Sequence, residues 1–401
     1  MFQHSKKLVS ATFVAISFAA CADGGKEDRP QSEVQITAQH HMYGFRSLRG
    51  FGTFPVQPSV AFSDRGKLNL FSDSTYTITR TSGTSAADRY ALAKDGAFSV
   101  FVTGSGSEPS VVFRGAYGLI APAPEFCFTD RVSTTSSPSV GLYYGTRIVQ
   151  GQVELEGAWH VLSLHAVFGQ VLQSPENVAR GAFGGVSITA GAAGTLRTIS
   201  GMGTQGTSGL VFGGTIQNVL DGGGNGDGTC NLEVSYQVGA QAVDTRPMQA
   251  VATSNLVLAL DEDETDGEAG MFFLVRKFDP PATPVDSARV VGTFLVGGHT
   301  FFVNPTNCGS DSFVGLVTLG LAGSFRLEAT GASGADFTYT GSYTLATDGA
   351  LTITIPGTGE TWHAAIDRGY QTLLFVDDFV EVRANNIPEL NLGFGVRQKT
   401  T

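Results

Sequence analysis

The sequence predicts an all-β protein built from three tandem antiparallel β-domains of about 125 residues each. Three observations support this fold class: the composition, a repeated turn and a repeated closing strand. The 401 residues include 52 glycines, and only 15% of the residues are charged. Such a composition is typical of twisted sheets joined by tight turns, and the length allows two or three domains.

The repeated turn is an Asp-Gly pair between two strands. The stretch YALAKDGAFSVFV at 90–102 resembles YTLATDGALTITI at 343–355, and GTIQNVLDG at 214–222 is a third copy. Asp-Gly between alternating apolar runs is a strong hairpin signal, because glycine accepts positive φ and aspartate bonds to the nearby backbone. The three pairs begin at Asp95, Asp221 and Asp348.

The repeated closing strand is an apolar run that ends in arginine. It reads LYYGTR at 142–147, MFFLVR at 271–276 and LGFGVR at 392–397. Opening strands recur in the same order, as YGFRSLRGFG at 43–52, WHVLSLHAVFG at 159–169 and GTFLVGGHTFF at 292–302. These repeats place three β-domains at 36–150, 151–287 and 288–401.

The strands of the third domain can be read in order. In the central hairpin Tyr343, Leu345, Leu351, Ile353 and Ile355 alternate with small or polar residues, so one face is buried. Eight sequential strands with short turns favour an up-and-down barrel, with a β-sandwich as the main alternative. A propeller is weaker, because no repeat near the period of about 40 residues is found. The strands are expected near 290–303, 313–321, 323–330, 337–347, 350–356, 360–367, 371–380 and 389–398.

The N-terminus has the layout of an export signal over residues 1–20. Two lysines precede an apolar stretch from Leu8 to Ala20, and Cys21 follows. The ending Phe18-Ala19-Ala20-Cys21 resembles the lipobox of bacterial lipoproteins, which implies that Cys21 is acylated and becomes the mature N-terminus. Alanine after the cysteine implies an outer-membrane location, facing the periplasm or the cell surface. A plain secretory signal is the alternative, and residues 21–35 are interpreted as a flexible tether.

The charge of the chain limits its partners. The formal net charge is −11, and removal of residues 1–20 takes away two lysines and leaves −13. Such a surface does not suit nucleic acid or anionic lipid head groups. No apolar stretch of about 18 residues follows Cys21, so membrane attachment is expected through the N-terminal lipid alone.

Three further cysteines leave two alternatives open. Cys127, Cys230 and Cys308 do not fall at equivalent places in the repeats. An exported protein could form at most one internal disulfide from them. Buried thiols are the other alternative.

Two short motifs carry a resemblance to a known family. Gly157-Ala158-Trp159 opens the second domain and Arg276 closes it, while Gly292-Thr293-Phe294 and Arg397 do the same in the third. This resembles the lipocalins and their calycin relatives. The resemblance implies small barrels with an apolar cavity, in which Trp159 and Arg276 form a structural pair that closes one end. In the first domain Met42-Tyr43 stands at this place.

Acidic clusters are the candidate metal sites. In DGGGNGDG at 221–228, Asp221, Asn225 and Asp227 could reach one Ca²⁺ ion, although an enlarged turn is the simpler interpretation. The acidic stretch LDEDETDGE at 260–268 is expected to be a solvated loop, with weak surface calcium binding as the alternative. Apart from this calcium alternative, the sequence predicts no metal or other cofactor.

Catalytic motifs are scarce. GMGTQG at 201–206 matches a dinucleotide pattern, but no helix is expected after it, so we interpret it as a hairpin turn. His160 and His165 should point to opposite faces of one strand, and His165 and His299 hold similar places in two domains. A structural role is expected for them. No G-x-S-x-G, H-E-x-x-H, C-x-x-C or P-loop pattern occurs.

The sequence therefore predicts a non-catalytic, lipid-anchored envelope protein with a structural role or a protein or glycan partner. A carrier of small apolar ligands is the second hypothesis, and it requires an apolar cavity of about 300 Å³ or more in one domain. An enzyme, the third hypothesis, requires polar groups that converge in one cleft.

Overall fold

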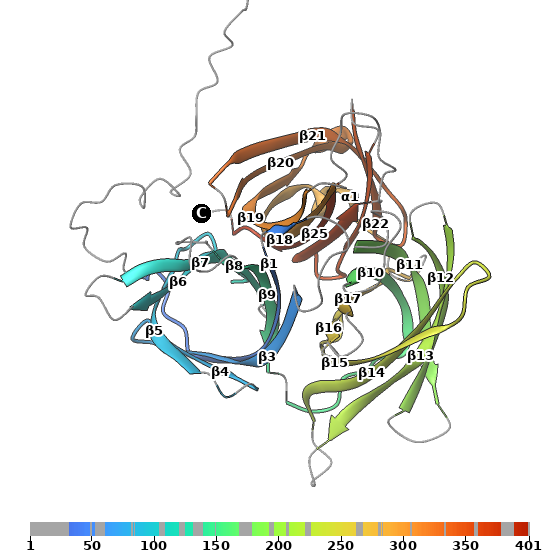
Figure 1. Ribbon diagram of the computed structural model, residues 1–401, viewed down its shortest axis with the longest axis horizontal. Coiled ribbons are helices and arrows are strands. Elements are labelled where there is room, and N and C mark those ends of the chain that lie inside the picture. The colour runs from blue at the N-terminus through green and yellow to red at the C-terminus, as the bar shows by residue number, and fades with distance from the viewer. Residues whose placement is uncertain are drawn as a thin grey trace, which may run out of the picture. The chain divides into compact units, whose positions relative to one another are not determined.

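Most of the described chain is β-strand, and the strands close into three antiparallel barrels of eight strands each (Figure 1). The first and last strands of each barrel pair with each other, so the barrel prediction is confirmed and the sandwich alternative is wrong. The computed structural model describes residues 32–48, 50–52, 61–81, 83, 85–103, 109–119, 125–130, 139–148, 150–167, 179–191, 196–205, 208–220, 226–261, 268–279, 282, 284–304, 307–332, 334–356, 360–377 and 389–399.

Strand order within each barrel follows the chain. The first barrel consists of β1 (Ala38–Leu48), β3 (Ala61–Leu70), β4 (Thr75–Arg80), β5 (Ser85–Leu92), β6 (Ala97–Thr103), β7 (Pro109–Tyr117), β8 (Glu125–Asp130) and β9 (Ser139–Arg147). The second consists of β10 (Gly157–Val167), β11 (Ala179–Ala190), β12 (Leu196–Gln205), β13 (Ser208–Leu220), β14 (Gly226–Val238), β15 (Asp244–Ala252), β16 (Leu256–Asp261) and β17 (Glu268–Arg276).

The third barrel follows the same plan. It consists of β18 (Gly292–Asn304), β19 (Asn307–Leu319), β20 (Ser324–Gly331), β21 (Asp336–Leu345), β22 (Ala350–Ile355), β23 (Glu360–Ile366), β24 (Thr372–Asp377) and β25 (Glu389–Arg397). A short strand from the first domain, β2 (Gly50–Gly52), pairs with β19. The described helices are α1 (Ser287–Val290) and a 3₁₀ turn, η4 (Leu321–Gly323). Neither is long enough to span a membrane.

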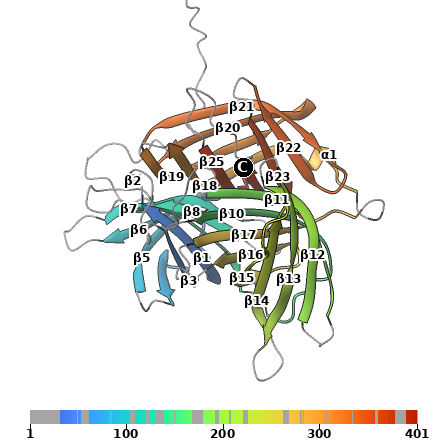
Figure 2. The same cartoon turned by 45° about the vertical axis from the view of Figure 1, so that its right-hand side comes forward.

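Every second residue of a strand faces the barrel interior, and these side chains fill it. Along β20, exposed and buried residues alternate without exception, as expected for a strand with one face on the core. In the second barrel the interior is built around Trp159 and Phe212, both fully buried. Figure 2 shows β11, β12, β13 and β14 of this barrel side by side.

The closing strands are buried on both faces, which explains their continuous apolar runs. Tyr144, Phe273 and Phe394 each lie three residues before the final arginine of a barrel and point away from its interior. Their rings meet one another, with centroids 4.8 Å apart for Tyr144 and Phe273 and 6.2 Å for Phe273 and Phe394. Three equivalent residues therefore bring the three barrels together in one aromatic contact.

Further contacts join each barrel to the next at the Asp-Gly turns. His41 of the first barrel lies 3.0 Å from the carbonyl oxygen of Asp227 in the second, and His160 of the second lies 3.0 Å from that of Asp348 in the third. Gln398 of the third barrel donates to the Asp95 carboxylate of the first at 3.0 Å. The equivalent turn of each barrel is thus a point of contact with a neighbouring barrel.

The structure corrects the position of the turn in the second barrel. Gly96, Gly228 and Gly349 all have φ near +90°, at +98°, +89° and +92°. In each case the preceding aspartate accepts a hydrogen bond from the backbone two residues on. Asp227-Gly228, and not Asp221-Gly222, is therefore equivalent to the other two pairs.

The opening strand of the first barrel also needs a correction. Trp159 pairs with Arg276 and Phe294 pairs with Arg397, and in the first barrel His40 pairs with Arg147. His40, and not Met42-Tyr43, therefore stands at the place of Trp159. Matching 43–52 to 159–169 by sequence places the first barrel three residues out of register. The match rests on a Ser-Leu pair that occurs at different structural positions in the two strands.

Candidate functional site

We call the end of the second barrel where β10 finishes and β15 begins its open end, because the Asp244 side chain is 45% exposed there. This end carries a cluster of inward-facing polar side chains. Ser163 and His165 follow Trp159 and Val161 on the inner face of β10, two residues apart each time. Tyr236 and Val238 end the inner face of β14, and Asp244 and Arg246 begin that of β15. This polar layer therefore covers the apolar core of the barrel.

A pocket of about 60 Å³ lies among these side chains. Leu210 and Val238 form part of its apolar wall. Its polar lining comes from Ser163, His165, Gln205, Tyr236, Gln241 and Asp244. The volume is well below the 300 Å³ or so that a carrier of small apolar ligands requires.

His165 is held by a ring contact and a hydrogen bond. Its Nε2 lies 3.0 Å from the Tyr236 hydroxyl, and the two rings meet edge to face at 5.2 Å. The imidazole occupies space above Gly270 of β17, where a Cβ atom would lie only 2.3 Å from Nδ1. Glycine at this position therefore makes room for the histidine.

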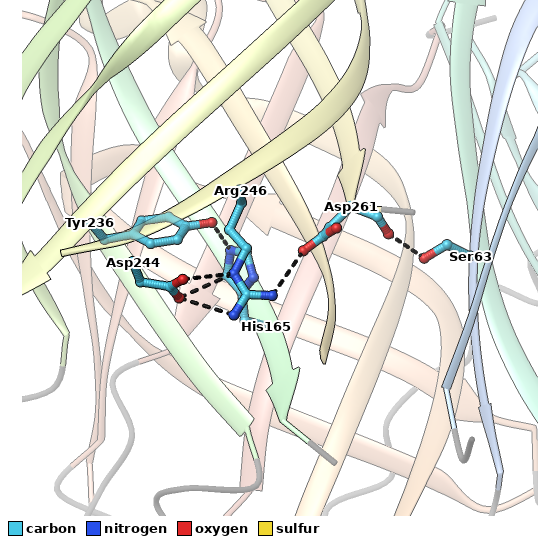
Figure 3. A network of polar contacts seen from close by, with 6 residues as sticks. All are labelled: Ser63, His165, Tyr236, Asp244, Arg246 and Asp261. Carbon is cyan, nitrogen blue, oxygen red and sulfur yellow. Dashed lines mark hydrogen bonds and ion pairs between the residues drawn. The ribbon is translucent and has the colours of Figure 1, made fainter. Parts of the chain in front are cut away.

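Arg246 links two carboxylates inside the barrel (Figure 3). Its Nε and Nη2 donate to Asp244 at 3.1–3.2 Å, and its Nη1 lies 3.7 Å from Asp261 Oδ2. Asp261 is fully buried, and its carbonyl oxygen accepts a 2.5 Å hydrogen bond from Ser63 of the first barrel. Counted formally, with both carboxyls ionised, one guanidinium and two carboxylates give this group a net charge of −1.

The Ser163 side chain lines the pocket, and its hydroxyl makes no hydrogen bond to the described residues. The residue is 1% exposed, and Ser163 Oγ has no hydrogen-bond partner among the residues that the structure describes. A buried hydroxyl without a partner costs free energy. The group is therefore suited to a ligand that supplies the missing hydrogen bond.

The other barrels fill the equivalent position. From the register with the closing strand, Gly44 and Gly298 are equivalent to Ser163. A Cβ atom on Gly44 would lie 2.6 Å from the Tyr143 ring, and one on Gly298 would lie 2.0 Å from the Phe313 ring. In the first and third barrels glycine thus lets an aromatic ring lie against this backbone position, whereas in the second barrel Ser163 faces the pocket.

Trp159 and Arg276 lie at the opposite end of the second barrel. The guanidinium lies 5.2 Å from the centre of the indole, and its Nη1 donates to the Glu154 carbonyl oxygen at 3.0 Å. Trp159 Nε1 donates to the Leu155 carbonyl oxygen at 2.9 Å. The pair holds the chain that enters the barrel, and a structural role in closing this end is the role we propose for it.

Several sequence-predicted residues cannot be placed. Cys21, Asp221 and Asn225 lie outside the described residues, as do 262–267 of the acidic stretch. The Asp227 carboxylate accepts from Thr229 and lies 3.3 Å from His41 Nε2. Among the described residues no group of acids, histidines and cysteines could hold a metal ion, and calcium binding stays a prediction.

The Gly-rich motif at 201–206 is a strand, and the hairpin-turn interpretation is wrong for most of it. Residues 201–205 continue β12 and pair with β11 and β13. A Cβ atom on Gly201 would lie 2.1 Å from the Gly185 carbonyl oxygen, so glycine permits this close approach.

The histidines occupy different environments. His165 faces the barrel interior, whereas His160 faces the third barrel, so the two point to opposite faces of β10. His299 is not equivalent to His165, because it lies five residues after Phe294 instead of six and contacts Ser47 of the first barrel at 2.9 Å. Burial lowers the pKa of His160 to about 4 and that of His299 to about 3.

Cys127 and Cys230 are free, buried thiols. Any disulfide among the three cysteines would need one of these two, so the disulfide alternative is wrong. Burial raises the pKa of both thiols to about 12, and neither is a reactive thiolate at neutral pH.

Comparison with known proteins gives little guidance. No protein-family model and no curated protein sequence matches the chain. Intact Ap-TbpB, with its N and C lobes, aligns at 7% identity over 92% of this chain and 79% of that chain, with a TM-score of 0.28. Transferrin Binding Protein B from serogroup B Neisseria meningitidis aligns at 9% identity over 92% and 79%, with a TM-score of 0.27. At TM-scores this low, neither the fold nor the binding properties of these proteins can be inferred for this chain.

Sequence reasoning missed most of the pocket. Ser163, Tyr236 and Arg246 stand in alternating strands where core and pocket positions look alike. One feature of the sequence could have indicated Asp261: the seventh strand of each barrel ends in aspartate. These residues are Asp130, Asp261 and Asp377.

Proposed function

We propose that this protein is a non-catalytic, lipid-anchored envelope protein that binds a protein or glycan partner at the open end of its second barrel. The observation that carries the proposal is the polar pocket with its unpaired Ser163 hydroxyl, at a position where the other two barrels have a glycine packed against an aromatic ring. The Cys21 anchor and the outer-membrane location are parts of the same proposal.

The pocket supports the other two hypotheses less well. A volume of about 60 Å³ is too small for an apolar ligand of the usual size. Catalysis by a serine nucleophile would need a hydrogen bond from its hydroxyl to a base. His165 Nε2 is bonded to Tyr236, and Ser163 Oγ has no hydrogen-bond partner in the described part of the chain.

Filling the pocket tests the proposal. Ser163→Val replaces the unpaired hydroxyl with methyl groups that suit a strand and occupy the cavity. We expect the wild-type chain to retain a specific envelope protein or glycan, and Ser163→Val to lose at least about 90% of it, which corresponds to a loss of more than about 1.4 kcal/mol. Quantitative mass spectrometry of the retained fraction measures this.

The matched control is Ser200→Val on the outer face of β12, where Ser200 is exposed. Equal retention by all three chains would contradict the proposed site. The anchor is tested separately: Cys21→Ala should move the protein from the membrane to the soluble fraction, and continued membrane partition would disprove lipid attachment.

A further inference from the structure

The size of the pocket in the second barrel limits the group that can enter it. A water molecule needs about 10–15 Å³ by the same measure, and an apolar cavity of about 150 Å³ holds benzene. The pocket of about 60 Å³ therefore admits the end of a side chain or a few waters, but not a six-membered ring.

The charge of the cluster favours a cation. Arg246 is already paired with Asp244 and Asp261, and the three groups together carry −1. The Asp244 side chain lines the pocket and is 45% exposed, so a ligand can reach its carboxylate. An anionic ligand would meet repulsion here.

The hydrogen-bonding groups of the pocket match an ammonium. Ser163 Oγ is buried, lines the pocket and lacks a partner among the described residues. Tyr236 Oη can accept one hydrogen bond in either tautomer of His165, and Asp244 accepts through its carboxylate. A primary ammonium has three donors and no acceptor, so these three oxygens could pair all of its N–H groups.

We infer that the open end of the second barrel binds an alkylammonium group of the kind that a lysine side chain carries. This inference rests on the proposed function and specifies the chemistry of its partner. The ammonium enters between Ser163 and Asp244, while the apolar wall at Leu210 and Val238 contacts its methylene chain. The same group occurs on a protein lysine and on a free polyamine, and the two sources differ in what lies beyond the methylene chain.

The test uses the full chain in detergent with n-butylammonium as the probe and 1-butanol as its neutral match. We expect butylammonium to bind with Kd of about 1 mM and to shift the ring signals of His165 and Tyr236 in NMR spectra, and butanol to bind at least about tenfold more weakly. Asp244→Asn should weaken butylammonium binding by about tenfold and Ser163→Ala by about threefold. Asp73→Asn removes the same charge at an exposed turn of the first barrel and should leave butylammonium binding unchanged.

Two further probes separate the sources. If Nα-acetyl-lysine methylamide binds more tightly than spermidine, the inference holds and the ligand is a protein lysine. If spermidine binds more tightly, the inference holds and the ligand is a polyamine. Equal binding of butylammonium and butanol would overturn the inference, as would equal weakening by Asp73→Asn and Asp244→Asn. If butylammonium fails to bind while Ser163→Val still abolishes partner retention, the ammonium inference falls and the proposed function stands.

Discussion

Ser163 holds a position that glycine occupies in the other two barrels, and the surrounding side chains differ accordingly. Glycine at 44 and 298 lets an aromatic ring lie across the strand, whereas serine on β10 has a pocket in front of it. A repeat built for stability keeps its core filled. We therefore interpret the departure in one copy as functional, because an unfilled layer with an unpaired hydroxyl reduces stability without helping the fold.

A first prediction concerns the glycine beneath His165. Gly270→Ala would place a Cβ atom 2.3 Å from His165 Nδ1, so the ring must move and its bond to Tyr236 must break. We expect a loss of about 1–3 kcal/mol in the free energy of unfolding, measured by urea denaturation. Gly209→Ala on β13 is the control, because no atom lies within 4 Å of its Cβ position. Equal stability of the two variants would contradict the packing described for His165.

At this scale the sequence indicated some roles and missed others. His165 was expected to be structural and to face away from His160, and the contacts with Tyr236 and Asp348 agree with that geometry. Arg246 could not be assigned, because an arginine at the start of a strand is usually solvated. Its burial depends on Asp244, two residues earlier on the same strand, and on Asp261 of β16, which only the barrel register brings near.

At the scale of strands and turns, apolar patterning predicted the number of strands well. The expected strands of the third domain overlap all eight strands from β18 to β25. Alternation failed on the closing strands, because β9, β17 and β25 are buried on both faces. Their outer faces contact neighbouring barrels, as Tyr144, Phe273 and Phe394 show. A continuous apolar run indicates such double burial, but it does not reveal what covers the second face.

A second prediction tests the corrected turn. Gly228 has φ of +89°, a conformation that costs an L-residue about 1–2 kcal/mol. Gly228→Ala should therefore lower the free energy of unfolding by about that amount, and calorimetry should show a lower Tm. Gly209→Ala, at a position without positive φ, should change it by less than about 1 kcal/mol. An unchanged Tm in Gly228→Ala would mean that the repeated turn lies elsewhere.

At the scale of the whole molecule, contacts between barrels join equivalent parts of the three copies. The repeat period predicted three domains, but no sequence pattern showed that Tyr144, Phe273 and Phe394 meet. These contacts join residues more than 100 positions apart, and a single sequence carries no signal for such pairs. The second barrel also depends on the first, since Ser63 holds the backbone of Asp261 at the pocket.

A third prediction addresses the aromatic contact between barrels. Phe273 is fully buried and packs against Tyr144 of the first barrel and Phe394 of the third. Phe273→Ala should cost about 3–5 kcal/mol of unfolding free energy, read from the shift of the urea midpoint. Phe71→Ala, at a side chain 41% exposed, is the control and should cost less than about 1 kcal/mol. Similar losses in both variants would argue against a packed contact between the barrels.

A fourth prediction concerns acid. Burial lowers the pKa of His160 to about 4, while its value in the unfolded chain is 6.5. Below pH 6.5 the unfolded chain therefore binds a proton that the folded chain does not, so this histidine favours folding above pH 6.5 and the advantage is lost as pH falls toward 4. His40 and His299, with pKa lowered to about 3, act in the same direction.

The pH effect can be isolated with one substitution. Between pH 6 and 4.5, His160→Gln should reduce the loss of unfolding free energy by up to about 2 kcal/mol. His363→Gln, at a half-buried histidine, serves as the matched change. Glu125 opposes the trend, because burial and the neighbouring Asp367 raise its pKa, so its contribution falls as pH rises above 4.5. Identical pH profiles for wild type and His160→Gln would show that this histidine is not buried between barrels.

The proposed function requires that partners contact the second barrel at its open end. Val243 is 59% exposed and lies between Ala242 and Asp244 of the pocket, whereas Leu321 is 78% exposed on the third barrel. A photo-crosslinking amino acid placed at position 243 in cells should join the protein to a partner, and the same group at position 321 should not. Crosslinking at 321 alone, or at neither position, would contradict the claim.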